Sequence, residues 1–360
     1  MIRKSLALFG LFFPLLGSAQ LTEREQQYKD SIDAVNAASQ LTAEFQDAYN
    51  AGNNAFAQKN YASAISSYEK AVGIAPTFKE AWYNKGVAEI EHKQFNDAVK
   101  SFAKLIELSA ENGKAFAQRG KAYMELKDYK NAELDFMKAV KLSPKNEKAA
   151  YNLGCVYFLM KDYKKGIEQF TNAIKIKPDF AYAYNDRGSC YRMLENYPLA
   201  VADYDAAIKY NPNLALALTN LGTVKKKMKD FKGALEAYNR AISIDANFHL
   251  AYNNRGSMFF EQEKFDDAIK DFDKVVSLKP DYAPAYNNRG SVKFKKKDYA
   301  GAEKDFDKAI QLDPNYGNAY ANRGVAREMT RNQAGACSDW KKARELGAEL
   351  GRKYAVSDCN

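Results

Sequence analysis

Nine glycines recur every 34 residues, with no insertion or deletion between the first and the last. They are Gly52, Gly86, Gly120, Gly154, Gly188, Gly222, Gly256, Gly290 and Gly324. A constant period of this length is typical of stacked supersecondary units, each of which contacts only its neighbours. The spacing therefore predicts a repeat array rather than a globule with a single core.

We number each glycine as position 8 of a 34-residue repeat. The nine repeats then begin at residues 45, 79, 113, 147, 181, 215, 249, 283 and 317. Position 20 is alanine in eight repeats and Gly166 in the fourth, and position 24 is aromatic in all nine. Positions 20, 24 and 27 share one face of a helix. We expect the small residues at positions 8 and 20 to let two helices approach closely, with the aromatic ring filling the space beside them.

Two further positions mark the ends of the second helix. Asn or Asp occupies position 16 in seven repeats, and either residue is a good helix N-cap. Proline occupies position 32 in six repeats, where it ends the helix. Each repeat is therefore predicted to consist of helix A, a short turn, helix B and a second short turn.

This pattern resembles the tetratricopeptide repeat family. Repeat 2 carries Trp82, Gly86, Phe95, Ala98 and Phe102 at the family positions. The resemblance covers residues 45–350. It implies an all-α, right-handed superhelical solenoid of helix-turn-helix repeats, whose concave face is lined by the A helices. It also implies a protein-interaction role, usually the gripping of an extended peptide.

The two ends of the chain differ from the repeats. Residues 1–19 have a basic start, an apolar run and the small residues Gly17-Ser18-Ala19, which predict a secretory signal peptide too short to span a membrane. We therefore expect an exported protein, periplasmic if the source is a Gram-negative bacterium and otherwise secreted. Residues 20–44 are expected to form an N-terminal helical cap or linker, and residues 351–360 the end of a C-terminal capping helix and a tail.

Charge gives a weaker indication of partners. Without Arg3 and Lys4 the chain keeps a modest surplus of seven positive charges, and export argues against a nucleic-acid partner. Clusters such as Lys225-Lys226-Lys227 fall at the ends of predicted A helices, where they complement the helix dipole or meet an acidic partner or membrane surface. No further segment is long and apolar enough to predict membrane insertion. The oligomeric state stays open.

Four cysteines follow the signal peptide. Cys337 falls early in the last B helix and Cys359 lies beside the chain end, so a disulfide between them would staple the capping helix to repeat 9. Cys155 and Cys190 fall on neighbouring A helices, whose axes are expected about 8–10 Å apart. Because a disulfide needs Cα atoms within about 7 Å, two small buried thiols are favoured there.

Positions 7 and 23 vary together across the repeats. Five repeats have arginine at position 7, and the same five have aspartate at position 23; the other four have neither. Arg255 and Asp271 are the pair in repeat 7. A partly buried guanidinium needs a carboxylate partner. We therefore expect these arginines to make structural ion pairs between helices A and B rather than to bind a ligand.

Binding residues are expected on helix A, at positions 5, 6 and 12. Position 6 is an amide in eight repeats, and amides can pair with a peptide backbone of any sequence. The candidate polar residues at positions 5 and 6 are Asn84, Asn152, Asn185, Asn220, Asn253, Asn254, Asn287, Asn288 and Asn322. In the N-terminal half, position 5 is instead Tyr49, Tyr83 or Tyr151 and position 12 is apolar, which predicts a more aromatic wall. The alternative is that the asparagines at position 6 only organise the helix surface and that position 12 packs against the neighbouring A helix.

The sequence contains no pattern typical of an enzyme or a cofactor site. The two histidines lack partner motifs, and no zinc-ligand spacing, nucleophile elbow or phosphate loop is present. We therefore expect a non-catalytic scaffold that has no cofactor and no metal and binds a protein or peptide partner, within a cell-envelope complex. A glycan-binding module and a purely structural spacer are the two alternatives.

Overall fold

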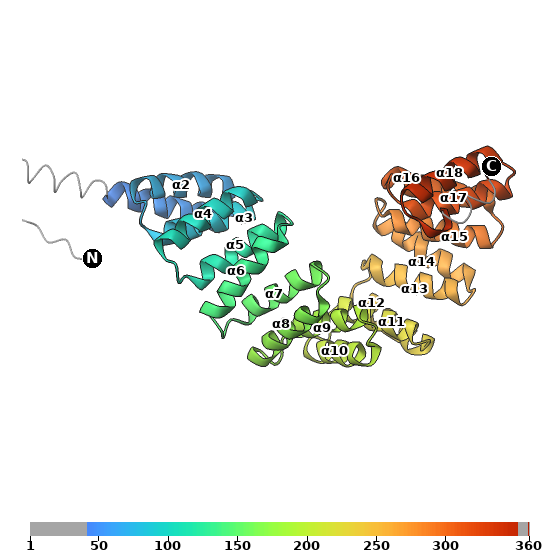
Figure 1. The fold of residues 1–360 in the computed structure, drawn as a ribbon, viewed down its shortest axis with the longest axis horizontal. Helices are drawn as coiled ribbons and strands as arrows, with labels where there is room; N and C mark the ends of the chain where they lie inside the picture. Colours follow the sequence, from blue (N-terminus) through green and yellow to red (C-terminus); the bar gives the residue numbers. More distant parts are fainter. Residues whose placement is uncertain (1–41, 352–358, 360) are drawn as a thin grey trace, which may run out of the picture. The chain divides into compact units, whose positions relative to one another are not determined.

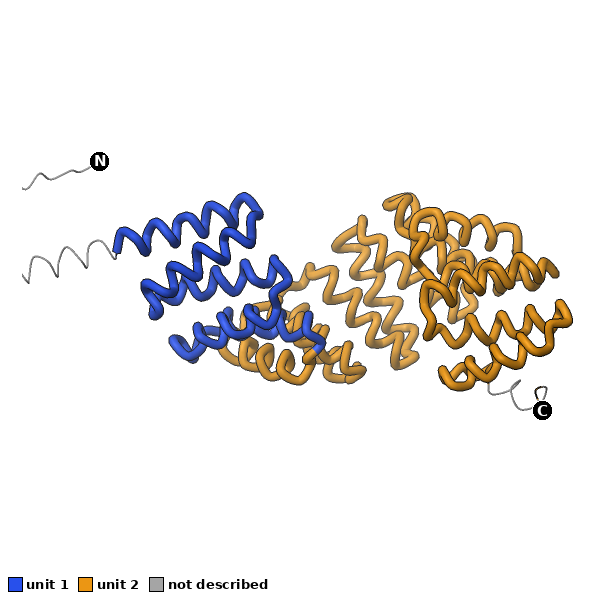
Figure 2. Tube along the Cα trace, turned by 90° about the horizontal axis from the view of Figure 1, so that it is seen from above, with its two compact units in different colours: residues 1–127 blue, residues 128–360 orange. Residues whose placement is uncertain are grey.

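The computed structural model describes residues 42–351 and residue 359, and every regular element among them is an α-helix. The predicted signal peptide and most of the predicted N-terminal cap lie outside these residues. The chain divides into two compact units, residues 1–127 and 128–360 (Figure 2). The described residues of each unit form a series of helices, which follow the colour sequence of Figure 1.

Unit 1 contains a helix over residues 42–57, followed by α2 (Tyr61–Ile74), α3 (Lys79–Glu91), α4 (Phe95–Leu108) and α5 (Gly113–Glu125). Unit 2 contains α6 (Tyr129–Leu142), α7 (Glu147–Leu159), α8 (Tyr163–Ile176), α9 (Ala181–Met193), α10 (Tyr197–Tyr210), α11 (Ala215–Lys227), α12 (Phe231–Ile244), α13 (His249–Glu261), α14 (Phe265–Leu278), α15 (Ala283–Lys295), α16 (Tyr299–Leu312), α17 (Gly317–Met329) and α18 (Gln333–Glu345). The odd-numbered helices from α3 to α17 are A helices and begin at position 1 of their repeats, as predicted. The even-numbered helices are B helices.

The turn from helix A to helix B has the same construction in every repeat. Position 15 adopts a left-handed conformation, with φ between 58° and 64°, although it is Lys, Glu or Arg and never glycine. The next residue is the N-cap of helix B. All seven Asn and Asp residues predicted there accept a hydrogen bond from a backbone N–H of the first helical turn. Gln94 and Lys264, which occupy this position in the other two repeats, make no such bond.

The position-8 glycines make room chiefly for an aromatic ring. A Cβ atom added to Gly222 would lie 2.6 Å from the Tyr238 ring, and one added to Gly86 would lie 2.7 Å from the Phe102 ring. In both cases the nearest atoms belong to position 24, whereas the sequence had indicated a contact mainly with position 20. The aromatic side chain therefore lies directly over helix A, and no larger residue fits beneath it.

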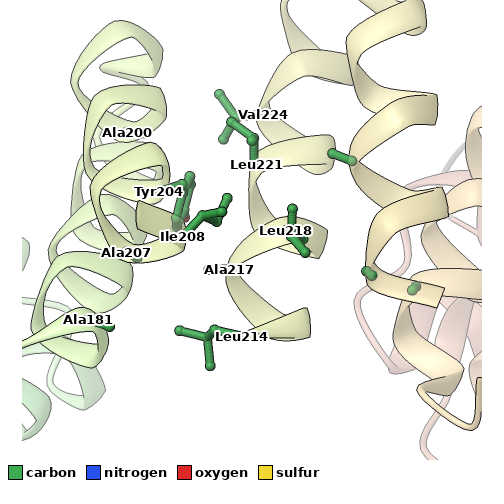
Figure 3. Close-up of a cluster of buried hydrophobic side chains, with 13 residues drawn as sticks. Ala181, Ala200, Tyr204, Ala207, Ile208, Leu214, Ala217, Leu218, Leu221 and Val224 are labelled. Atoms are coloured by element: carbon green, nitrogen blue, oxygen red, sulfur yellow. The ribbon is translucent and has the colours of Figure 1, made fainter. Parts of the chain in front are cut away.

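Within each unit, adjacent repeats bury apolar side chains against one another. Between α10 and α11, Tyr204 and Ile208 face Leu218 and Leu221 from the next A helix (Figure 3). Within each unit, consecutive A helices contact one another, whereas consecutive B helices do not. The A helices therefore form the inner, more tightly curved side of each unit, and we call this side the A-helix face.

The chain end packs against the last repeat. Ala348 is buried against Ala321 and Ala343, and residues 349–351 begin a further helix. Cys337 and Cys359 are joined by a disulfide with a Cα–Cα distance of 5.4 Å, while Cys155 and Cys190 are free thiols. Over the described part of the chain, the helices are too short or too polar to cross a bilayer.

Candidate binding face on the A helices

The arginines at position 7 belong to the scaffold. In repeat 7, Arg255 Nε and Nη2 donate to the two oxygens of Asp271 at 2.8 and 2.6 Å. The same paired contact joins Arg187 to Asp203, Arg289 to Asp305 and Arg323 to Asp339. These four aspartates are buried. Arg119 and Asp135, the fifth pair in the sequence, lie in different units.

In repeat 2 a lysine replaces the arginine at position 7 and makes different ion pairs. The Nζ of this residue, Lys85, lies 2.5 Å from a carboxylate oxygen of Glu69 and 3.4 Å from one of Glu89. Glu89 is only 2% exposed, and its Oε2 has no hydrogen-bond partner. Burial is the main cause that raises the pKa of Glu89 above its usual value. Lys85 therefore pairs with a carboxylate of the preceding helix α2 and, at a longer distance, with one of its own helix α3, and the two-bond contact of an arginine is absent.

The candidate amides bond to one another across repeats. The position-6 side chain donates to the position-5 side chain of the preceding repeat at 2.9–3.2 Å. The pairs are Asn84 with Tyr49, Gln118 with Tyr83, Asn220 with Asn185, Asn288 with Asn253, and Asn322 with Asn287. The sequence reasoning assigned these groups to a bound peptide and missed this use. It could have been found, because position 5 is tyrosine, asparagine or threonine in seven of the nine repeats and can pair with the polar group at position 6.

In the C-terminal repeats these bonds form one directed chain. It runs from Asn322 through Asn287, Asn288, Asn253 and Asn254 to Thr223, with donor to acceptor distances of 2.9, 3.5, 3.0, 3.3 and 3.2 Å. An amide has two N–H groups and two lone pairs. Asn288, which is half-buried, uses one N–H group and one lone pair in the chain, so it keeps one donor and one acceptor for another molecule.

Three pockets on the A-helix face are built from equivalent positions. One lies in unit 1 and has a volume of about 170 Å³, while two in unit 2 have volumes of about 270 and 310 Å³. Each is lined by the position-12 phenylalanine and the position-24 aromatic residue of one repeat and by position 6 of the next. These residues are Phe56, Tyr68 and Asn84; Phe158, Phe170 and Asp186; and Phe294, Phe306 and Asn322. Each pocket therefore combines an apolar wall with polar side chains, one of which comes from position 6.

The 270 Å³ pocket is bordered by α7, α9 and α11, and we call it the Asp186 pocket. Its carboxylate accepts hydrogen bonds from Tyr151 Oη at 2.6 Å and from Asn185 Nδ2 at 2.8 Å. Burial raises the pKa of Asp186, and the two hydrogen bonds lower it. Cys155 also lines the pocket, and burial together with the nearby Asp186 charge raises the pKa of its thiol to about 12. The thiol is thus neutral at pH 7.

The other predicted binding residues lie on the same face. Tyr49, Tyr83 and Asn84 line a further cavity of about 300 Å³ in unit 1. Asn152 is half-buried on α7, although it lines none of the pockets described above. Positions 2, 9 and 13, which usually line the groove of such repeats, also contribute here: Leu216, Ser189 and Leu159 line the Asp186 pocket.

Comparisons with known proteins identify the repeat. Family models of the tetratricopeptide repeat match residues 55–117 and 113–146, and then five consecutive segments: 147–180, 181–214, 215–248, 249–282 and 283–316. The chain belongs to the tetratricopeptide repeat family. Proteins of this family bind protein partners, and the repeat is typically a non-catalytic scaffold. No curated protein matches the chain.

Two solved structures with TM-scores above 0.5 show the same fold. A tetratricopeptide repeat protein from Parabacteroides merdae ATCC 43184 is 19% identical, with a TM-score of 0.57, and the match covers 69% of this chain and 99% of that one. The Cut9–Hcn1 hetero-tetramer of APC/C gives 15% identity and a TM-score of 0.58, covering 83% of this chain and 59% of that one. A MamA protein is 25% identical over 48% of this chain and 94% of that one, with a TM-score of 0.45.

Proposed function

We propose that this protein is an exported scaffold that binds an extended protein segment along the A-helix face, within a cell-envelope complex. The observation that carries the proposal is the set of equivalent pockets, one in unit 1 and two in unit 2, each with an apolar wall and a polar group from position 6. An extended peptide places side chains and backbone groups at regular intervals. Apolar pockets that recur beside hydrogen-bonding amides suit both kinds of group.

Export is part of the same proposal and rests on the N-terminal sequence. Arg3 and Lys4 precede an apolar run that ends at Gly17-Ser18-Ala19. We expect the protein purified from its native source to begin at Gln20. N-terminal sequencing would show this, and a mature protein that retains Met1 would contradict export by this route.

Peptide binding is tested by blocking the face without disturbing the core. Leu216 is 37% exposed and lines the Asp186 pocket, so arginine at this position would fill the groove and leave the helix pairing intact. We expect Leu216→Arg to reduce cross-linking of partner proteins in intact cells at least tenfold. The matched control is Glu236→Arg, at an exposed position of helix α12 in the same repeat.

A double substitution of Asn253 and Asn287 by alanine tests the amide chain. Both residues belong to the chain of hydrogen bonds between the position-5 and position-6 side chains, so thermal unfolding of the variant must be measured beside its binding. Loss of the same cross-linked partner from a folded variant is the expected result. Retention of the partner in both Leu216→Arg and the double variant would place the binding surface elsewhere. Saturation-transfer signals from glycan fragments, without any peptide binding, would favour a glycan-binding module instead.

A further inference from the structure

Asp186 differs from the residue at the same position in every other repeat. Position 6 is an amide in the remaining eight repeats and a carboxylate only here. The hydrogen bond between position 6 and position 5 of the preceding repeat therefore runs in the opposite direction. In five other repeats the position-6 amide donates to a position-5 oxygen, whereas Asp186 accepts a hydrogen bond from the Tyr151 hydroxyl. The side chains around Asp186 are thus arranged to support a negative charge.

That charge has no counter-ion among the described residues. Its two oxygens each accept one hydrogen bond, from neutral Tyr151 and neutral Asn185, and no described lysine or arginine pairs with it. A carboxylate offers about four acceptor sites, so two remain. A partly buried charge without a partner is costly for the folded protein. The raised pKa of Asp186 agrees with this cost.

The walls of the pocket suit the stem of a long side chain. Phe158 and Phe170 line the inside, and Leu159 and Leu216 form a rim, with 45% and 37% of their surfaces exposed. Helix α9, which carries Asp186, also has two exposed apolar residues, Tyr182 and Met193. Lysine and arginine bury their methylene stems along such surfaces while the charged group reaches a polar partner. An aliphatic side chain would fill the same walls and leave the carboxylate unpaired.

We propose that the Asp186 pocket binds a basic side chain, arginine or lysine, of the segment held on the A-helix face. The stem lies against Phe158, Leu159 and Leu216, and the cation pairs with the Asp186 carboxylate. Tyr151 and Asn185 hold that carboxylate in place from behind. This inference rests on the proposed function and deepens it, because it requires a basic residue in the bound segment where that segment crosses repeats 4 to 6.

A small-molecule titration tests the pocket independently of any peptide. The probe is n-butylguanidinium, and n-butylurea is its neutral isostere. We expect n-butylguanidinium to shift the methyl NMR signals of Leu159 and Leu216, with at least tenfold weaker effects from n-butylurea. Asp186→Asn should remove the difference between the two probes. Equal shifts from both probes, or no shift from n-butylguanidinium, would overturn the proposal even if peptides bind the face.

Peptide libraries then test the link to function. Each library contains acetylated octapeptides with one fixed central residue (arginine, lysine, citrulline, norleucine or glutamate) and uncharged residues elsewhere. We expect the wild type to favour arginine and lysine over the neutral residues about tenfold or more, and Asp186→Asn to lose that preference. The matched control is Asp205→Asn, which makes the same change at an exposed position of α10 in the same repeat.

The outcomes separate the two proposals. If peptides bind with no preference for basic residues, or if Asp186→Asn keeps the preference, the basic-residue inference is wrong and the groove function stands. If no library binds while n-butylguanidinium binds the pocket through Asp186, the peptide function is wrong. Folding does not confuse the result, because Asp186→Asn removes an unpaired charge. Its thermal midpoint should equal or exceed that of the wild type.

Discussion

Gly52 and Gly73 lie on the same helix pair, yet an added methyl group would meet different surroundings at the two positions. A Cβ atom on Gly52 would approach the Tyr68 ring to 2.6 Å, while one on Gly73 would have no neighbour within 4 Å. We expect Gly52→Ala to destabilise the protein by about 1–3 kcal/mol through overpacking. Gly73→Ala should stabilise it by about 0.5–1 kcal/mol, because glycine is unfavourable inside a helix. Urea unfolding of both variants would check the contrast.

The ion pair between Arg255 and Asp271 is expected to act as a unit. Asp271 is 4% exposed, so removal of Arg255 leaves an unpaired buried carboxylate. Replacement of both residues by apolar side chains, Arg255→Met with Asp271→Leu, should therefore cost less than the two single changes added together. We expect a coupling energy of about 1–3 kcal/mol from urea unfolding. Simple additivity of the single effects would show that the two residues act independently.

Glu89 gives the clearest pH dependence. Its folded-state pKa is raised, chiefly by burial, so the folded protein holds this proton more tightly than the unfolded chain does. The stability that protonation of Glu89 contributes is fully present below the unfolded-state pKa of about 4.3. It is lost as the pH rises through the folded-state pKa of Glu89. We expect Glu89→Gln to be more stable than the wild type at pH 7 and to lose this advantage near pH 4. A stability difference that does not change with pH would contradict this account.

At the level of the helix, the repeats differ in the N-cap of helix B, which lacks a side-chain hydrogen bond in two of them. Lys264 precedes α14 without a side-chain cap, whereas Asn60, Asn196 and Asn332 cap the B helices of other repeats. We expect Lys264→Asn to stabilise the protein by about 0.5–1 kcal/mol. The reverse change, Asn196→Lys, should destabilise it by a similar amount. If Lys264→Asn and Asn196→Lys both unfold at the same temperature as the wild type, the N-cap side chain contributes nothing to stability.

The helices were predictable because each depends on local chemistry. The aromatic ring at position 24 packs on the position-8 glycine in the repeats where this contact is described, and the Asn or Asp at position 16 caps helix B in seven repeats. The left-handed residue at position 15 was not predictable from its type. Lys161 and Glu195 adopt φ values of 64° and 58°, which favour glycine in other turns. The turn geometry imposes the conformation there, and a charged side chain pointing to solvent tolerates it.

The candidate site was predictable only in part, because it depends on pairs of repeats. Position 6 was identified from its amides, but its partner at position 5 belongs to the preceding A helix. The Asp186 pocket likewise takes Phe158, Asp186 and Leu216 from three different helices. A pattern within one repeat does not contain such contacts. They become visible only when equivalent positions of successive repeats are placed side by side.

The whole molecule is expected to respond to damage locally, since among the described helices of each unit a repeat contacts only its neighbours. The disulfide between Cys337 and Cys359 ties the chain end to repeat 9 and closes a loop with a sequence separation of 22 residues. A loop of this size predicts about 3 kcal/mol of stabilisation. We expect the Cys337→Ser, Cys359→Ser double variant to lose hydrogen-exchange protection in α17 and α18, while protection in α9 to α12 stays unchanged. Mass spectrometry with and without reductant would first establish the bond in the purified protein. Loss of protection along the entire array would show that the repeats unfold as one cooperative unit instead.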